Sequence, residues 1–211
     1  MGGKPESWAT PYDEGVNSMA PKNGINLHKI LLAATEIIDT NGLEELTLAS
    51  LAQKLDIRSP SLYNHFAGLD DIRRLLSIYG LEQLLSVLMR SAVGRSGDEA
   101  IREMAKAYIG FARAHPGLYE VTLIAPAYND DDLQKVGQDI VDLVTQVLEA
   151  YQMEKSDTIH VARALRSHLH GFASLEQRGG FGMPIDLDES FMHMVDTFLA
   201  GLHIRYPQRS K

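Results

Sequence analysis

Six side chains in one short segment have the chemistry to contact a nucleic acid. They follow Asp56, and all but one are uncharged hydrogen-bonding groups: Arg58, Ser59, Ser61, Tyr63, Asn64 and His65. Hydroxyl, amide and guanidinium groups hydrogen-bond to phosphates and to base edges, and an arginine can contact a guanine through two hydrogen bonds. We expect Tyr63 and His65 to contact phosphates or sugars, and the other four to lie near base edges or the flanking backbone.

Two short predicted helices position these side chains. Thr47 is a good N-cap for a first helix, in which apolar residues recur at helical spacing: Leu48, Leu51, Ala52 and Leu55. After residues 56–58 break the pattern, Ser59 as N-cap and Pro60 at the first helical position predict a second helix. Its inner face carries only Leu62 and Phe66. This plan is typical of a helix-turn-helix that reads DNA, in which Thr47 offers a phosphate its hydroxyl and a helix N-terminus, although such units also serve only for packing.

A third helix completes a predicted domain over residues 25–70. Asn26 is suited to cap it, apolar residues from Leu27 to Ile38 share one face, and Asn41-Gly42 is a left-handed stop signal. Residues 1–24 show no periodicity and predict a mobile leader.

The amino-acid sequence of the first domain resembles that of a known family. The segment LTLASLAQKLDIRSPSLYNHF, preceded by TNGLEEL, closely resembles the DNA-binding domain of TetR-family transcriptional regulators, and SPSLYNHF is its most specific part. The resemblance covers residues 27–76. It implies an all-α protein with a three-helix DNA-binding domain and a larger helical domain, residues 71–211, for ligand binding and dimerisation. It also implies a homodimer that binds a palindromic DNA operator, acts as a repressor and is released by a small-molecule effector.

Composition sets further bounds. The 211 residues are 45% hydrophobic and 23% charged, as in ordinary globular proteins, and no apolar run is long enough to span a membrane. The absence of cysteine excludes disulfides and, together with the lack of a signal-peptide pattern, predicts a cytoplasmic protein. We expect no enzymatic activity, cofactor or metal site, because no phosphate-binding glycine loop is present and no two of the eight histidines are four residues apart.

Net charge argues against strong non-specific DNA binding. The whole chain carries −8, and residues 25–75 hold five basic and seven acidic side chains. The family usually has a phosphate-gripping lysine three residues after the aromatic that closes the reading helix, but here that position is Leu69, followed by Asp70 and Asp71. Arg73 or Arg74, about one turn further on, offers a replacement charge. The sequence thus predicts a DNA affinity that is lower than is usual in the family and that depends more on base contacts.

A long helix over residues 69–91 is predicted to link the two domains, as a lever that a ligand could tilt. Helices over residues 156–177 and 189–204 follow later, and the first of them has two apolar or small-residue stripes. Such helices can pair with a second copy as a four-helix bundle, or can simply close the core of one chain. The predicted dimer contacts are Leu165, Phe172, Phe191, Val195, Phe198 and Leu202.

Apolar and aromatic residues of the larger domain predict a cavity for an apolar or aromatic effector, between the helices that start near Asp98, Asp130 and Ser156. The candidate lining residues are Met104, Tyr108, Phe111, Tyr119, Leu123, Phe172 and Met183. The polar contact would come from Tyr108 or His168, although we favour His168 as a hydrogen-bonded interior residue. A filled core explains the same pattern equally well. The alternative function is therefore a helical small-molecule-binding protein whose helix-turn-helix no longer reads DNA.

Overall fold

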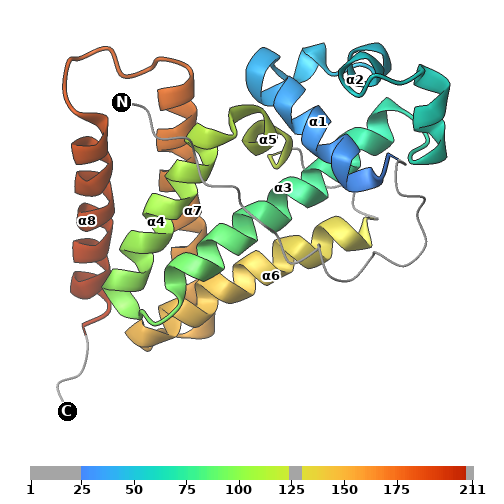
Figure 1. Ribbon diagram of the computed structural model, residues 1–211. Helices are drawn as coiled ribbons and strands as arrows, with labels where there is room; N and C mark the ends of the chain where they lie inside the picture. The colour runs from blue at the N-terminus through green and yellow to red at the C-terminus, as the bar shows by residue number, and fades with distance from the viewer. Residues whose placement is uncertain (1–24, 124–129, 208–211) are drawn as a thin grey trace.

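The computed structural model describes residues 25–123 and 130–207, and all regular secondary structure in these residues is helical (Figure 1). The predicted leader, residues 1–24, lies outside them. We call residues 25–70 the head and residues 71–211 the body. The head contains α1 (Leu27–Asn41), η2 (Leu43–Glu45), α2 (Leu48–Lys54) and η3 (Ser59–Asn64). The other elements are α3 (Leu69–Ala92), α4 (Gly97–Ala114), α5 (Pro116–Val121), α6 (Asp131–Leu148), η4 (Glu149–Tyr151), α7 (Lys155–Gln177) and α8 (Leu187–Arg205).

Local sequence signals explain where the head helices begin and end. The Asn26 side chain accepts the Lys29 backbone N–H at 2.9 Å, as expected of an N-cap, and Gly42 ends α1 with φ of +90°. Thr47 caps α2. Three fully buried leucines close the centre of the head and hold α2 and η3 against α1. Leu46 lies just before α2, Leu51 lies on α2, and Leu62 lies on η3.

The second reading helix differs from the prediction. It is a short 3-10 helix, η3, rather than an α-helix, and its N-cap position is Arg58 instead of Ser59, with no side-chain cap. Pro60 therefore falls at the second position of the helix. With only six residues, η3 gains too few backbone hydrogen bonds to adopt regular α-geometry.

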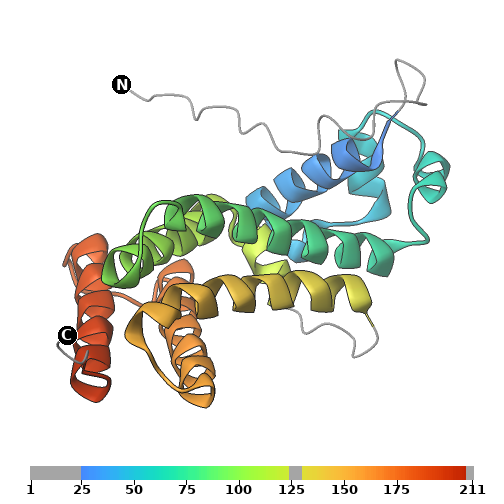
Figure 2. The ribbon, with the colours of Figure 1, turned by 90° about the horizontal axis from the view of Figure 1, so that it is seen from below.

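Helix α3 crosses the boundary between head and body. It runs from beside η3 through the length of the body, as predicted to within one residue, and lies alongside α6 (Figures 1 and 2). One buried stripe, Ile72, Leu76, Leu84 and Leu88, packs into the shared core. Helix α8 lies at the end of the molecule remote from the head (Figure 1). No helix in the described ranges is long and apolar enough to cross a membrane.

Candidate nucleic-acid interface

The polar residues predicted to read DNA lie on the outer face of η3 and the turn before it. Arg58, Ser61, Tyr63 and Asn64 are exposed, and Tyr63 keeps 57% of its surface accessible. Ser59 and His65 are partly buried. Leu62 and Phe66 are buried beneath them, so the apolar face fixes η3 and leaves the hydrogen-bonding face outward.

Thr47 caps α2 through a reciprocal pair of hydrogen bonds. Its hydroxyl accepts the Ser50 N–H at 3.0 Å, and the Ser50 hydroxyl accepts the Thr47 N–H at 3.0 Å. The serine takes the role that glutamate usually has in such a box, which the sequence pattern did not reveal. The Thr47 side chain remains exposed at a helix N-terminus, a favourable place for a phosphate.

Two basic side chains in or beside the head are already engaged. Lys54 pairs with Glu36 at 2.5 Å. Arg74 donates hydrogen bonds to Asp130 at 2.5 and 2.9 Å and to Asp132 at 2.8 Å. The hydrogen bond from Arg74 lowers the pKa of Asp130. Within the described residues the Arg58 guanidinium has no such partner, which leaves it available to DNA.

The suggestion that Arg74 replaces the missing family lysine is therefore wrong, because that side chain ties α3 to the start of α6. Arg73 is no better placed. Its guanidinium lies 3.8 Å from Asp70, and its Nε atom is buried without a hydrogen-bond partner among the residues described.

Replacing Leu69 by lysine is expected to tighten binding to operator and random DNA alike. Leu69 is the first residue of α3, and only part of its side chain packs against the core, so a lysine is tolerated there. One added phosphate contact per head steepens the log–log salt dependence by about one unit per head. Binding titrations at several salt concentrations measure this slope, with Leu69→Gln as the uncharged control. An unchanged slope would mean that this helix start does not face the DNA backbone.

Five of the residues predicted to line an effector cavity lie in the interior of the body: Met104, Tyr108, Phe111, Tyr119 and Phe172. The Tyr108 and Tyr119 hydroxyls are 2.9 Å apart, and the Tyr119 hydroxyl is 2.8 Å from Nδ1 of His170. Burial raises the pKa of both phenols, so they stay protonated and able to donate. His170, which the sequence analysis did not select, belongs to this polar cluster, and His168 does not.

The other three predicted ligand residues lie elsewhere. Leu123 is 38% exposed after α5, and Met183 is 72% exposed between α7 and α8. The interpretation of His168 as an interior residue is wrong, because its side chain is exposed and its Nδ1 lies 2.7 Å from the Ala164 carbonyl oxygen of its own helix. Hollows that the structure describes lie away from the buried cluster, one between α7 and α8 and one between the ends of α3 and α6. Among the described residues, no three His, Asp or Glu side chains are grouped to bind a metal.

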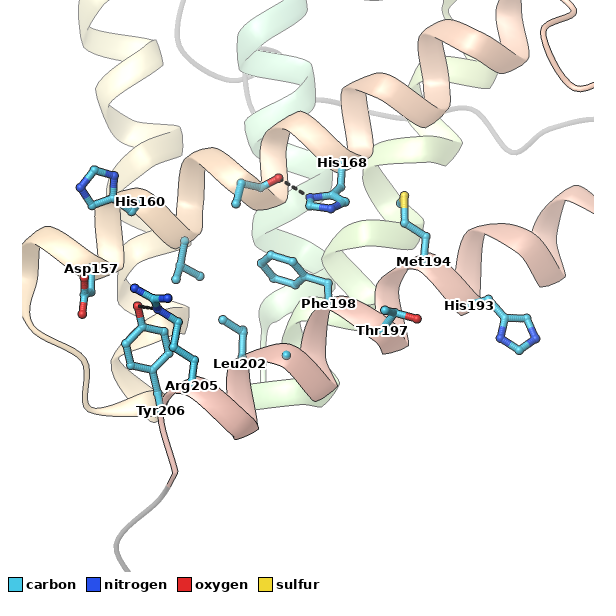
Figure 3. A pocket seen from close by; sticks show the side chains of 13 residues that line it. Asp157, His160, His168, His193, Met194, Thr197, Phe198, Leu202, Arg205 and Tyr206 are labelled. Atoms are coloured by element: carbon cyan, nitrogen blue, oxygen red, sulfur yellow. Dashed lines mark hydrogen bonds between the residues drawn. The ribbon is translucent and has the colours of Figure 1, made fainter.

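The hollow between α7 and α8 is a groove of about 650 Å³ on the outer face of the body (Figure 3). His168 and Phe198 face each other in it, with ring centroids 5.4 Å apart, while His193 points away. Of the six predicted dimer contacts, only Phe198 is partly exposed in the groove. The other five are 7% exposed or less in the single chain and pack inside it: Leu165, Phe172, Phe191, Val195 and Leu202. Burial of one apolar stripe in the core leaves the second stripe of α7 outward.

Two curated proteins are similar over almost their whole length. An uncharacterized HTH-type transcriptional regulator of Bacillus subtilis is 40% identical over 188 residues, which cover 88% of this chain and 97% of that protein. Another, from Mycobacterium tuberculosis, is 32% identical, covering 97% of this chain and 91% of that protein. Together with the exposed reading face, these relatives define a helix-turn-helix transcriptional regulator. Residues 101–198 match the family described as "Tetracyclin repressor-like, C-terminal domain". The chain belongs to the TetR family.

Solved structures agree on the fold. A protein of unknown function from Rhodococcus sp. RHA1 superposes with a TM-score of 0.73 at 23% identity, covering 87% of this chain and 98% of that one. A TetR variant from Acinetobacter baumannii AYE, in complex with minocycline, gives a TM-score of 0.67 at 18% identity, covering 88% of this chain and 100% of that one. These two structures share the all-helical fold of this chain over both the head and the body.

Proposed function

We propose that the chain is a repressor that binds a palindromic DNA operator as a homodimer and is released by a small apolar or aromatic effector. The observation that carries the proposal is the outer face of η3, where Arg58, Ser61, Tyr63 and Asn64 are exposed over a buried Leu62. A regulator of chromosomal genes acts in the cytoplasm of a bacterial cell, and we assign it no catalytic activity.

The groove between α7 and α8 supports the homodimer. It exposes small and apolar side chains, among them Ala164, Met194, Phe198 and Gly201, which a second copy can cover as the other half of a four-helix bundle. A two-fold axis there would place the two α8 helices at the centre and the two heads at the outside, because α8 is remote from the head (Figure 1). Two heads then read two half-sites.

Replacing Phe198 by glutamate is expected to produce monomers and to remove most of the operator affinity. The charge would be buried without a partner in the dimer, at a cost of several kcal/mol, whereas in the monomer it remains partly exposed. Sedimentation velocity measures the oligomeric state, and circular dichroism checks the fold. Leu202→Glu is unsuitable, because Leu202 is buried in the single chain.

The matched control is Ala200→Glu, which adds the same charge to an exposed position of α8 outside the groove. It should remain dimeric. If Phe198→Glu is folded and dimeric as well, the interface lies on another face of the body.

The effector site is proposed among the interior side chains of α4, α5 and α7, with Tyr108 as the polar contact and Phe111 and Phe172 as apolar walls. His170 replaces His168 as the alternative to Tyr108, because Nδ1 of His170 lies 2.8 Å from the Tyr119 hydroxyl. The A. baumannii protein, which has this fold and is in complex with minocycline, supports the binding of a small molecule. An entering aromatic ligand must displace packed side chains, and so would shift α4 against α3 and change the separation of the heads.

The test of this function is a mobility-shift assay with duplexes that flank the protein's own gene, followed by a thermal-shift screen of aromatic compounds. We expect one shifted complex on a specific duplex, and release by any compound that raises the melting temperature. A protein that binds a compound but no duplex would favour the alternative, a small-molecule-binding protein whose head no longer reads DNA. The acidic excess of the head is the observation that keeps this alternative open.

A further inference from the structure

One acidic side chain of the head stands where its own helix disfavours it. Asp39 lies in the last turn of α1, which ends at Asn41 and has no basic residue in that turn. The C-terminal end of a helix carries a partial negative charge, so a carboxylate there is destabilising for α1. A contact outside α1 must account for its position.

That contact is with the body. One Asp39 carboxylate oxygen accepts the backbone N–H of Leu118 at 2.9 Å, and the other lies 2.8 Å from Nδ1 of His115. Leu118 is the third residue of α5, and His115, at the N-cap position, makes no side-chain cap of its own. Asp39 therefore performs the capping role for α5 across the boundary between head and body.

The two backbones are in close contact at this point. A Cβ atom on Gly117 would lie 2.2 Å from the Ile38 carbonyl oxygen and 2.8 Å from the Asp39 backbone nitrogen. Helix α5 lies between α1 and α4 (Figure 1). Only a glycine lets α1 approach closely enough for the carboxylate to reach the Leu118 N–H.

Helix α5 is in turn fixed to three body helices. The Val121 carbonyl accepts a hydrogen bond from Ser77 of α3 at 3.0 Å. Tyr119 is hydrogen-bonded to Tyr108 of α4 and to His170 of α7. The head is thus joined to the body by the continuous α3, by packing of α1 against α3 and α5, and by the Asp39 hydrogen bonds at the start of α5.

We infer that Asp39 is the positioning residue that sets the orientation of the reading head on the body. It does not contact DNA itself. Apolar packing is non-directional whereas hydrogen bonds have a preferred geometry, so the Asp39 contacts fix the angle at which α1 lies on α5. This inference rests on the proposed function in one respect: two heads bind a palindrome tightly only if both are held in register at once.

Operator affinity and head orientation are measured for Asp39→Ala and Asp39→Asn, with Glu36→Gln as the matched control. Glu36 is also an acid of α1, but its partner Lys54 lies within the head. Because the chain has no cysteine, spin labels can be attached at Glu44→Cys in the head and Asp139→Cys in the body, both exposed. Double electron–electron resonance, with the labelled protein diluted in unlabelled protein, then reports the distance within one protomer.

We expect Asp39→Ala to bind operator at least about tenfold more weakly, with affinity for random DNA changed less than about twofold and a broadened distance distribution. Asp39→Asn should recover part of the operator affinity and part of the narrow distance distribution, since its side-chain oxygen still accepts the Leu118 N–H. Glu36→Gln should match the wild type in both measurements. If Asp39→Ala does not fold, Asp39→Asn still tests whether Asp39 orients the head.

The inference is overturned by a folded Asp39 variant with an unchanged distance distribution, or by one whose distribution broadens without loss of operator affinity. If the wild type shows no preference for any duplex, the proposed function fails, yet the label distances still decide whether Asp39 orients the head.

Discussion

Replacing Tyr63 by alanine is expected to lower operator affinity by about a hundredfold, or about 3 kcal/mol, without unfolding the protein. The Tyr63 side chain is 57% exposed on the outer face of η3, so it contributes little to packing in the free protein. On DNA it would lie against the sugar–phosphate backbone and donate its hydroxyl to a phosphate. Fluorescence anisotropy with a labelled duplex measures the affinity, and circular dichroism measures the fold.

Two further variants sharpen this prediction. Tyr63→Phe keeps the ring and loses only the hydroxyl, and should lose a smaller part of the affinity. Met89→Ala removes a side chain of similar exposure, 51%, near the far end of α3, and should bind as the wild type does. Undiminished binding by folded Tyr63→Ala would mean that another face of the head meets the DNA.

Replacing Gly117 by alanine is expected to destabilise the protein by about 3 kcal/mol or more, because the added Cβ would overlap backbone atoms of α1. The added Cβ would lie 2.2 Å from the Ile38 carbonyl oxygen and 2.3 Å from its carbon. No side-chain rotation relieves this overlap, so α1 and α5 must move apart. The hydrogen bonds of Asp39 to α5 are then lost. The melting temperature should fall by roughly 6–12 °C for a chain of this length.

Gly110→Ala is the matched control for Gly117→Ala. Gly110 lies within α4, and a Cβ there would meet nothing within 4 Å, so alanine should stabilise the helix by about 1 kcal/mol. Calorimetric scans of the two variants should therefore shift in opposite directions. A Gly117→Ala protein that melts at or above the wild-type temperature would show that α1 and α5 are not held this closely.

Local signals predicted the helix ends of the head and the outward polar face of η3 well. Asn26, Thr47 and Gly42 mark helix ends through contacts within a few residues of chain, which is why the sequence alone revealed them. The outward direction of Tyr63 followed equally from the spacing of Leu62 and Phe66. The short η3 was misjudged only in its helix type and cap.

Contacts between distant segments could not be predicted from periodicity. Arg74 and Asp130 are 56 residues apart, and Asp39 and Leu118 are 79 apart, so no local pattern connects them. The same limit applies to α7, where the sequence showed two apolar or small-residue stripes and did not say which one faces the core. Only the packed chain shows that Leu165 faces inward while His168 faces the groove.

A footprint of the wild-type protein on the duplex flanking its own gene tests the central claim most directly. A homodimer with two oriented heads predicts two protected patches related by a two-fold axis, with half-site centres one helical turn, about 34–36 Å, or a multiple of it apart. Protection of a single half-site, or uniform weak protection without sequence preference, would contradict the claim that this chain reads a palindromic operator through η3.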